Sequence, residues 1–199
     1  MKITTGLVSL LIGSSSFAAN YNLDSSHGEV GFSVKHLMIS NVKGNFSKFK
    51  GGFEFDAEKK ELKNISVEID TASVNTNEPK RDEHLKSPEF LDTAKFGQMT
   101  FKGEKAEFKK GKPVKVSGTL TLHGVSKPVT LDIDYGGTAV DPWGNNRVAF
   151  TASTTIKRKD FGLTWNKTLD GGGVVVGDDV KISIESEAIA EKAPEKAAK

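Results

Sequence analysis

The sequence predicts an all-β domain built from eight antiparallel strands. Apolar and polar residues alternate with period two along eight separate runs, which is the pattern of strands whose two faces meet different environments. Short turn sequences such as Gly51-Gly52, His123-Gly124 and Gly136-Gly137 separate the runs. Strands joined by such short connections are expected to be antiparallel. The chain has 199 residues, which is enough for one domain and a short appendage.

The eight runs are defined by apolar residues on one side of each strand. None of these one-sided positions carries a formal charge, so the space that the strands enclose is predicted to be apolar. The run from Val129 to Tyr135 is the most regular, because its apolar residues alternate with Thr130, Asp132 and Asp134. In chain order the runs are Val30–Val34, Phe53–Phe55, Ile65–Ile69, Met99–Phe101, Val114–Leu122, Val129–Tyr135, Val148–Ile156 and Val180–Ile184.

Periodicity alone leaves two architectures open, a sandwich of two sheets and a closed barrel. Closure would remove the exposed strand edges that invite aggregation. The interior of an eight-stranded barrel is either filled by side chains or holds one small ligand. Gly118, Ala152 and Thr154 are small residues at inward positions, which favours a cavity, although a glycine in a strand also marks a bend or a bulge.

Composition excludes several classes of function. The chain has 28 Lys and Arg against 26 Asp and Glu, a net charge of +2, so no nucleic-acid partner held by bulk charge is expected. The absence of cysteine removes disulfides, thiolate catalysis and an N-terminal lipid anchor.

Three segments fall outside the strand pattern. Residues 1–18 are predicted to be a signal peptide, because Lys2 precedes a short apolar run and small residues follow at the spacing of a cleavage site. This places the domain, residues 19–188, in the periplasm. Residues 78–86 contain good helix formers and predict a short helix. Residues 189–199 are rich in Ala, Glu and Lys and predict a disordered tail.

Candidate polar site residues are few. His27, His84 and His123 fall at the ends of predicted elements, where they could face a cavity mouth, but neither His-x-His nor helical His-x-x-x-His spacing occurs, and no metal or other cofactor is expected. Arg81 could bind an anionic headgroup, and Asp82 could orient His84 as an acid–base pair. No Gly-x-Ser-x-Gly motif is present, so an enzyme is not the favoured interpretation.

Five motifs in order resemble the YceI-like family of secreted bacterial proteins. They are Arg81–Leu85, Phe90–Asp92, Gly118–Val129, Arg158–Leu163 and Gly177–Val180. The resemblance implies a lipocalin-like eight-stranded antiparallel barrel with an elongated apolar cavity that binds polyisoprenoid or similar long-chain lipids. The chain departs from the family pattern at His27-Gly28, where His-Ser is common, and at Phe96-Gly97, where an aromatic-Pro pair is common.

We therefore predict periplasmic binding or carriage of a long-chain amphiphilic lipid. One alternative is a redox accessory protein that shelters a quinone, and another is a metal-dependent or acid–base enzyme that uses His27, His84 and His123. Transient contact with a membrane or a membrane protein is compatible with the prediction, and both a monomer and a dimer remain open. The predicted ligand-binding residues are Phe32, Val34, Arg81, Asp82, His84, Gly118, Leu120, His123, Phe150, Ala152 and Thr154.

Overall fold

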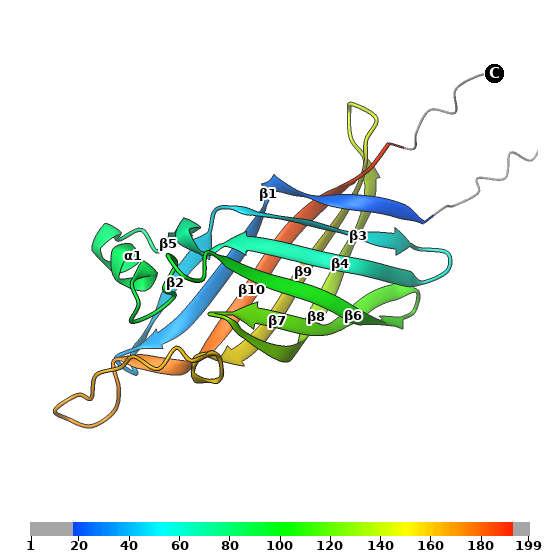
Figure 1. The fold of residues 1–199 in the computed structure, drawn as a ribbon. Coiled ribbons are helices and arrows are strands. Elements are labelled where there is room, and N and C mark those ends of the chain that lie inside the picture. Colours follow the sequence, from blue (N-terminus) through cyan, green and yellow to red (C-terminus); the bar gives the residue numbers. More distant parts are fainter. Residues whose placement is uncertain (1–17, 193–199) are drawn as a thin grey trace, which may run out of the picture.

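A computed structural model describes residues 18–192, which form an elongated, closed β-barrel with a short helix at one end (Figure 1). The strands are antiparallel wherever they pair. Their bounds are β1 (Ala19–His36), β2 (Ser40–Phe46), β3 (Phe49–Asp56), β4 (Glu61–Asp70), β5 (Val74–Asn75), β6 (Gln98–Lys109), β7 (Lys112–Leu122), β8 (Val125–Val140), β9 (Asn146–Lys157) and β10 (Val176–Ala190). Two 3₁₀ turns, η1 (Thr71–Ser73) and η2 (Arg158–Phe161), and one helix, α1 (Pro79–Lys86), complete the described elements.

Eight strands close the barrel in the order β1-β3-β4-β6-β7-β8-β9-β10, and β10 pairs with β1 to complete the ring. The closing register places Tyr21 opposite Ala190 and Val34 opposite Val180. Both β2 and β3 pair with β1, so together they act as one interrupted strand. The prediction of an eight-stranded antiparallel barrel is therefore confirmed, with β2 and the two-residue β5 as additions at one end.

Each of the eight predicted runs lies within a strand of the ring, but the strands are longer than the runs. The largest difference is in β1, which begins at Ala19 rather than near Val30. Ala19, Tyr21 and Leu23 do alternate with polar residues at its start, but the polar stretch from Asp24 to His27, where the pairing with β10 is irregular, separates this alternation from the predicted run. At the other end of the chain, β10 continues to Ala190, two residues beyond the predicted end of the domain at residue 188.

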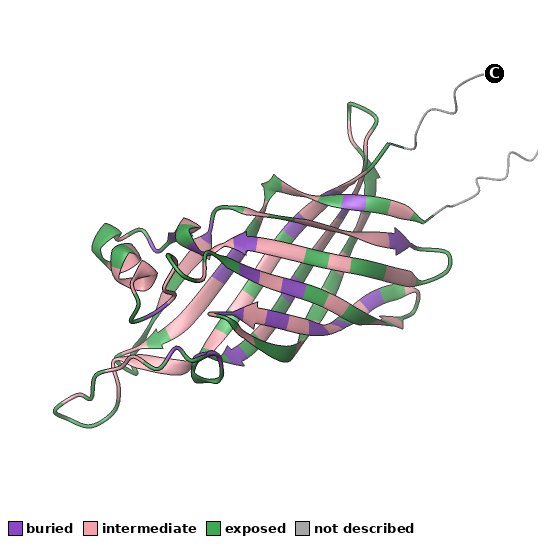
Figure 2. Ribbon diagram, viewed as in Figure 1, coloured by how far each residue is buried: buried purple, intermediate pink, exposed green. Residues whose placement is uncertain are grey.

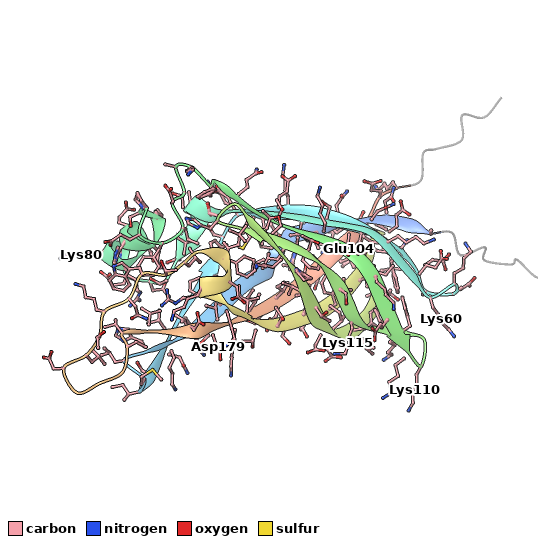
Figure 3. All side chains as sticks on the ribbon, turned by 60° about the horizontal axis from the view of Figure 1, so that its bottom comes forward. Lys60, Lys80, Glu104, Lys110, Lys115 and Asp179 are labelled. Atoms are coloured by element: carbon pink, nitrogen blue, oxygen red, sulfur yellow. The ribbon has the colours of Figure 1, made fainter. Side chains whose placement is uncertain are left out.

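Burial along the barrel follows the two faces of each strand (Figure 2). In β8 the inward residues from Val129 to Tyr135 are half-buried and the outward residues between them are exposed. The inward side chains are not fully buried because they border a cavity. Charged side chains such as Lys110 and Lys115 project from the outside of the barrel (Figure 3).

One end of the barrel is filled by aromatic side chains. Tyr21 stacks on Phe53 with ring centroids 5.5 Å apart, and Phe55 lies 5.8 Å from Tyr135. Tyr21 and Phe55 belong to a separate apolar cluster with Val148 and Ala188. These contacts narrow the end of the barrel at which β1 begins and β10 ends.

Helix α1 lies at the opposite end (Figure 1) and begins with a well-formed cap. The Glu78 carboxylate accepts hydrogen bonds from the backbone N–H groups of Lys80 at 3.3 Å and Arg81 at 2.5 Å, and Pro79 occupies the first helical position, where its missing N–H costs nothing. The predicted helix over residues 78–86 is confirmed. No residue of this helix is fully buried, but Leu85 packs against the apolar core and, with Arg81 and His84, lines the cavity.

Both predicted terminal segments fall mostly or partly beyond the described part of the chain. The predicted signal peptide lies outside it except for residue 18, and the last seven residues of the predicted tail, 193–199, also lie outside it. Among the described residues, no helix has the length and apolar character needed to span a membrane.

Candidate functional site: an apolar cavity with a basic end

An elongated cavity of about 380 Å³ runs inside the barrel. Along β9 it is lined from Val148 to Ile156, a distance of about 26 Å at the rise of a β-strand. Cavities of roughly 300–1,000 Å³ are typical of sites for small organic ligands. The length of this cavity suits an extended ligand rather than a compact one.

The wall is formed by the inward faces of the barrel strands. Most of the lining side chains are aliphatic or aromatic, and among the described residues no Asp or Glu lines the cavity. Representative wall residues are Val30, Phe32, Phe49, Val67, Phe101, Leu120, Leu131, Ile133, Phe150, Ile156, Ile182 and Ile184. Such a wall recognises a ligand by excluding water from apolar surface, a driving force that has no directional requirement.

All charged or readily protonated side chains that line the cavity are basic, and they lie near the end that carries α1. Lys35 and His36 come from the end of β1, Arg81 and His84 from α1, and Arg158 from η2. Electrostatic attraction is stronger beside an apolar wall than in water. This end of the cavity therefore favours an anionic group.

Arg158 is the most buried of these cations, with only 3% of its surface exposed. Its Nη1 donates to the carbonyl oxygens of Leu163 at 2.5 Å and Trp165 at 2.8 Å, and its Nε donates to that of Gly177 at 2.8 Å. All the hydrogen-bond acceptors of Arg158 within the described chain are neutral backbone carbonyl oxygens. Burial lowers the pKa of Arg158, although Asp178 opposes this effect. Arginine stays protonated in proteins, so the wall carries a buried positive charge that no carboxylate of the described chain contacts.

Arg81 is held in place through Thr76. Its Nε donates to Thr76 Oγ1 at 2.8 Å and its Nη2 to the Thr76 carbonyl oxygen at 2.9 Å. The Thr76 hydroxyl in turn donates to Asp82 Oδ1 at 2.5 Å, and the Thr76 N–H donates to the same oxygen at 2.8 Å. Within residues 18–192, Nη1 of Arg81 makes no hydrogen bond and is available to a ligand.

His84 lies between two aromatic rings at the same end. Its ring meets those of Phe90 and Trp165 edge-on, with centroids 4.9 and 5.0 Å apart, and its Nε2 contacts Glu89 Oε2 at 2.5 Å. Phe90, Trp165 and His84 all line the cavity. The site therefore contains an aromatic frame beside the basic groups. Asp82 contacts Thr76 rather than His84, so the expected acid–base pair is not formed.

The structure separates the predicted ligand-binding residues into two groups. Those that line the cavity are Phe32, Val34, Arg81, His84, Leu120, Phe150, Ala152 and Thr154. Asp82, Gly118 and His123 do not line it. Asp82 still belongs to the site indirectly, because it holds the threonine that positions Arg81. Contact of any of these residues with a ligand stays a prediction.

Gly118 is small for a reason other than the cavity. A Cβ atom at this position would lie 2.2 Å from the Lys102 carbonyl oxygen and 2.8 Å from the Cα of Gly103, the residue paired with it in β6. The two glycines allow the backbones of β6 and β7 to approach closely. The small size of Gly118 is therefore explained by strand packing and is not evidence for the cavity.

The histidines do not converge on one site. His123 is at the β7–β8 corner, where its Nδ1 lies 3.2 Å from the Phe161 carbonyl oxygen and its ring packs against Phe96. His27 is on the exposed part of β1, with Nδ1 3.0 Å from Asp24 Oδ2. Across residues 18–192 no group of three or more His, Asp or Glu side chains is arranged to hold a metal ion.

Comparison with known proteins gives the family. The sequence profile of the YceI-like domain matches residues 21–188. The chain belongs to the YceI-like family. A UPF0312 protein of Shewanella baltica is 40% identical over 165 residues, covering 79% of this chain and 86% of that protein. A UPF0312 protein of Serratia proteamaculans is 44% identical over 167 residues, covering 82% and 85%.

Solved YceI-like structures share the barrel. A crystal structure of a YceI protein from Campylobacter jejuni is 40% identical, with a TM-score of 0.68 over 80% of this chain and 90% of that one. BcnA of Burkholderia cenocepacia, at 22% identity, has a TM-score of 0.70 over 83% and 98%. A polyisoprenoid binding domain from Saccharophagus degradans, at 19% identity, has a TM-score of 0.63 over 88% and 100%. At these low identities, the similarities to BcnA and to the polyisoprenoid binding domain show only that this chain has the same fold.

Sequence reasoning missed part of the basic end of this YceI-like cavity. Lys35 and His36 follow the first predicted run, and Trp165 lies outside every run. Arg158 belongs to a motif of the YceI-like family, which was the available signal that this position matters. Its burial at the cavity wall follows only from the three-dimensional structure.

Proposed function

We propose that the protein binds and carries a long-chain amphiphilic lipid of the polyisoprenoid type, with its tail in the barrel and an anionic head at the basic end. The observation that carries this proposal is the asymmetry of the cavity. It is apolar along the strands, has basic groups near α1, and has no Asp or Glu among the lining residues of the described chain. The similarity in fold to a protein described as a polyisoprenoid binding domain supports the same ligand class. The proposal includes no catalytic step and no cofactor.

The tail supplies the affinity. Each methylene moved from water into the barrel contributes about 0.8 kcal/mol before the cost of ordering the chain is subtracted. About ten buried methylenes would therefore contribute roughly 8 kcal/mol, which leaves a useful affinity after that subtraction. Because the wall has no directional groups along most of its length, the tail can be recognised by its length and flexibility rather than by its pattern of double bonds.

The head supplies the orientation. Arg81 has an Nη1 without a hydrogen-bond partner among the described residues, Lys35 lines the cavity from β1, and Arg158 adds a buried positive charge to the wall. Charge-assisted hydrogen bonds from guanidinium groups to phosphate or carboxylate oxygens are shorter and stronger than neutral ones. A phosphate or carboxylate head would therefore lie at the α1 end, with the tail directed toward Tyr21 and Phe55.

We also propose that the protein works in the periplasm, on the basis of the leader-like composition of residues 1–18. Fractionation of cells that express the full chain tests this location. Recovery of an unprocessed chain in the cytoplasm would contradict it.

The ligand can be tested on protein purified without detergent. Native mass spectrometry should detect a bound compound whose fragments show a long hydrocarbon tail, and a stripped sample should take up a polyprenyl phosphate more tightly than the matching polyprenol. An absorbance spectrum of the same sample identifies a quinone if one is bound. A protein that retains no lipid, and that shows no calorimetric heat with either polyprenyl compound, would rule out the proposed function.

A further inference from the structure

The tip of the β1–β2 hairpin is an exposed apolar patch. Leu37, Met38 and Ile39 are consecutive, and their exposed fractions are 36%, 53% and 81%. The other large apolar residues that are exposed within residues 18–192 are Val140, the last residue of β8, and Trp143, in the β8–β9 connection. The hairpin tip is thus the longest continuous exposed apolar segment of the described chain.

The backbone of this tip is unfavourable for the residues that it carries. Leu37 and Met38 have φ values of 50° and 63°, and the turn is closed by a hydrogen bond from the Ile39 N–H to the His36 carbonyl oxygen at 3.1 Å. Positive φ at both central positions is the geometry in which Asn-Gly is preferred and bulky side chains are disfavoured. The side chains of Leu37 and Met38 therefore do not stabilise the turn, which points to a role for them at the protein surface.

The tip also lies at the rim of the cavity. His36, directly before Leu37, lines the cavity, and the Leu37 N–H donates to the carbonyl oxygen of Val175, another lining residue, at 2.8 Å. The loop after η2 approaches from the other side, where a Cβ atom added to Gly173 would lie 3.6 Å from Met38 Cγ. In Figure 1 this hairpin and this loop together form one end of the molecule.

Basic residues flank the patch. In residues 35–43 and 164–177 the formally charged residues are Lys35, Lys43, Lys167 and Asp170. The next acidic residues, Asp178 and Asp179, bind the Lys159 N–H and the Lys157 ammonium, so positive charge predominates at the tip itself. Lys35, Lys43 and Lys167 are exposed. An apolar tip surrounded by lysines is complementary to a bilayer that contains anionic lipid, into which the side chains insert while the lysines meet the headgroups.

We propose that the Leu37-Met38-Ile39 tip docks the protein on an anionic lipid bilayer, with the basic end of the cavity facing the membrane. The choice of a bilayer rather than a protein as the partner rests on the proposed function, since a lipid carrier must meet the membrane that holds its ligand. The docking surface is separate from the lipid cavity, because none of the three tip residues lines the cavity.

Vesicle flotation tests the docking with the full chain. The protein should bind vesicles of phosphatidylcholine mixed with phosphatidylglycerol more tightly than vesicles of phosphatidylcholine alone, and added salt should weaken the binding. The L37N/M38G variant, which suits the turn geometry, combined with Ile39→Ser, should bind the mixed vesicles at least about tenfold more weakly, since it removes the exposed apolar side chains.

The matched control removes exposed apolar side chains elsewhere. The Val140→Ser/Trp143→Ser variant should bind mixed vesicles as the unmodified protein does. A tip reporter, Ile39→Trp in a Trp143→Phe/Trp165→Phe background, should show a blue-shifted emission with mixed vesicles. Equal vesicle binding by the tip variant and the unmodified protein would overturn the proposal. So would a lack of vesicle binding by both proteins, and a protein partner would then be the alternative explanation of the exposed tip.

Uptake of polyprenyl phosphate in solution, measured on the same variants, distinguishes this proposal from the proposed function. The tip variant should take up the lipid with unchanged affinity, because its cavity is intact. If the unmodified protein binds vesicles but takes up no lipid, the docking surface stands and the proposed function fails. If it takes up lipid but binds no vesicles, only the docking proposal fails.

Discussion

Nη1 of Arg147 donates to Oδ2 of Asp24 at 2.8 Å and so joins β9 to β1 across 123 residues of sequence. The same guanidinium reaches Asp141, after β8, at 3.0 Å and Glu187, in β10, at 2.9 Å. This network lies at the end of the barrel where β1 begins and β10 ends. It ties the strands that close the ring to the β8–β9 connection, at the end opposite the basic groups of the cavity.

Acid should weaken this network. Hydrogen bonds from Ser26 and Arg147 hold the pKa of Asp24 well below its ordinary value of 3.8. Burial raises the pKa of Asp141, but hydrogen bonds from Asn145 and Arg147 outweigh this and hold it well below the same value. Lowered carboxyl pKa values stabilise the fold above the unfolded pKa, and that stability is lost as the pH falls through the folded values. We expect Tm to fall steeply below about pH 4, where the unfolded carboxyl groups begin to take up protons.

Replacing the shared cation should remove part of this pH dependence. Arg147→Gln should lower Tm by several degrees at neutral pH, because the three carboxylates then repel one another, and should flatten the decrease in acid. Thermal melts of the variant and the unmodified protein across the acid range measure both effects. Lys115→Gln, which breaks an exposed pair with Asp132, is the control and should change Tm little. An unchanged melting profile for Arg147→Gln would contradict this role.

Filling the cavity should block the ligand. Ala152 lines the cavity from β9, and Ala152→Trp should lower the affinity for a polyprenyl phosphate by at least about tenfold by occupying the space of the tail. Ser153→Trp, on the exposed face of the same strand, should leave the affinity unchanged. Circular dichroism melts identify a misfolded variant, in which case Thr154→Phe is the second test. Full uptake by a folded Ala152→Trp protein would place the tail elsewhere.

Arg81 should distinguish headgroups. Arg81→Met should weaken binding of a polyprenyl phosphate about tenfold to a hundredfold, because a charge-assisted hydrogen bond is lost, and should leave the affinity for the uncharged polyprenol almost unchanged. Calorimetric titration with both compounds provides the comparison. Equal losses for the two compounds would assign Arg81 to the structure of the rim instead of to the ligand.

Thr76 should act through Arg81. Thr76→Val removes the hydroxyl that accepts from Arg81 Nε and donates to Asp82, so Arg81 becomes mobile while its charge remains. We expect a loss of polyprenyl phosphate affinity smaller than that of Arg81→Met. In the Arg81→Met background the second substitution should have no further effect on affinity, since the two residues act as one unit. Additive losses in the double variant would show that Thr76 acts independently.

Gly97 offers a stabilising substitution that leaves the cavity untouched. Gly97 lies in the turn directly before β6. Two hydrogen bonds hold this turn. The Thr71 hydroxyl donates to the Phe96 carbonyl oxygen, and the Thr71 N–H donates to the Gly97 carbonyl oxygen. A Cβ atom there would meet only the Thr93 carbonyl oxygen, at an ordinary 3.5 Å. Gly97→Ala should raise the free energy of unfolding by about 0.5 kcal/mol by restricting the unfolded chain. Denaturant titration tests this, and a decrease would indicate strain in the turn.

The strands could be predicted where one face is uniformly apolar, as from Val129 to Tyr135. Strand β2 could not, because Gly44 takes an inward position at which a Cβ atom would lie 2.6 Å from the Phe32 ring. The aromatic ring supplies the bulk that the glycine lacks, so the apolar alternation is hidden in the sequence. Long-range packing of this kind leaves no local periodicity.

The apolar wall of the cavity could be predicted from the sequence, but only part of its basic end could. Lys35 alternates with Val34 and reads as an outward residue, but the β1–β10 register shifts between Val34 and His36, and both Lys35 and His36 line the cavity. Arg158 binds only backbone carbonyl oxygens, which any sequence provides, so no partner residue reveals its burial. Irregular strand pairing and hydrogen bonds to backbone carbonyl oxygens leave little trace in the pattern of residue types along a sequence.

The pairing of Tyr21 with Ala190 has a practical consequence. The first and last strands of the ring end side by side, next to the aromatic cluster and away from the basic groups of the cavity. An affinity handle or a surface linker attached after residue 192 would hold the molecule by the end that the aromatic cluster narrows, and would leave the basic end of the cavity oriented toward the solution. A peptide linker between the two neighbouring ends would likewise permit a circularly permuted chain, with new termini opened at the exposed β6–β7 turn.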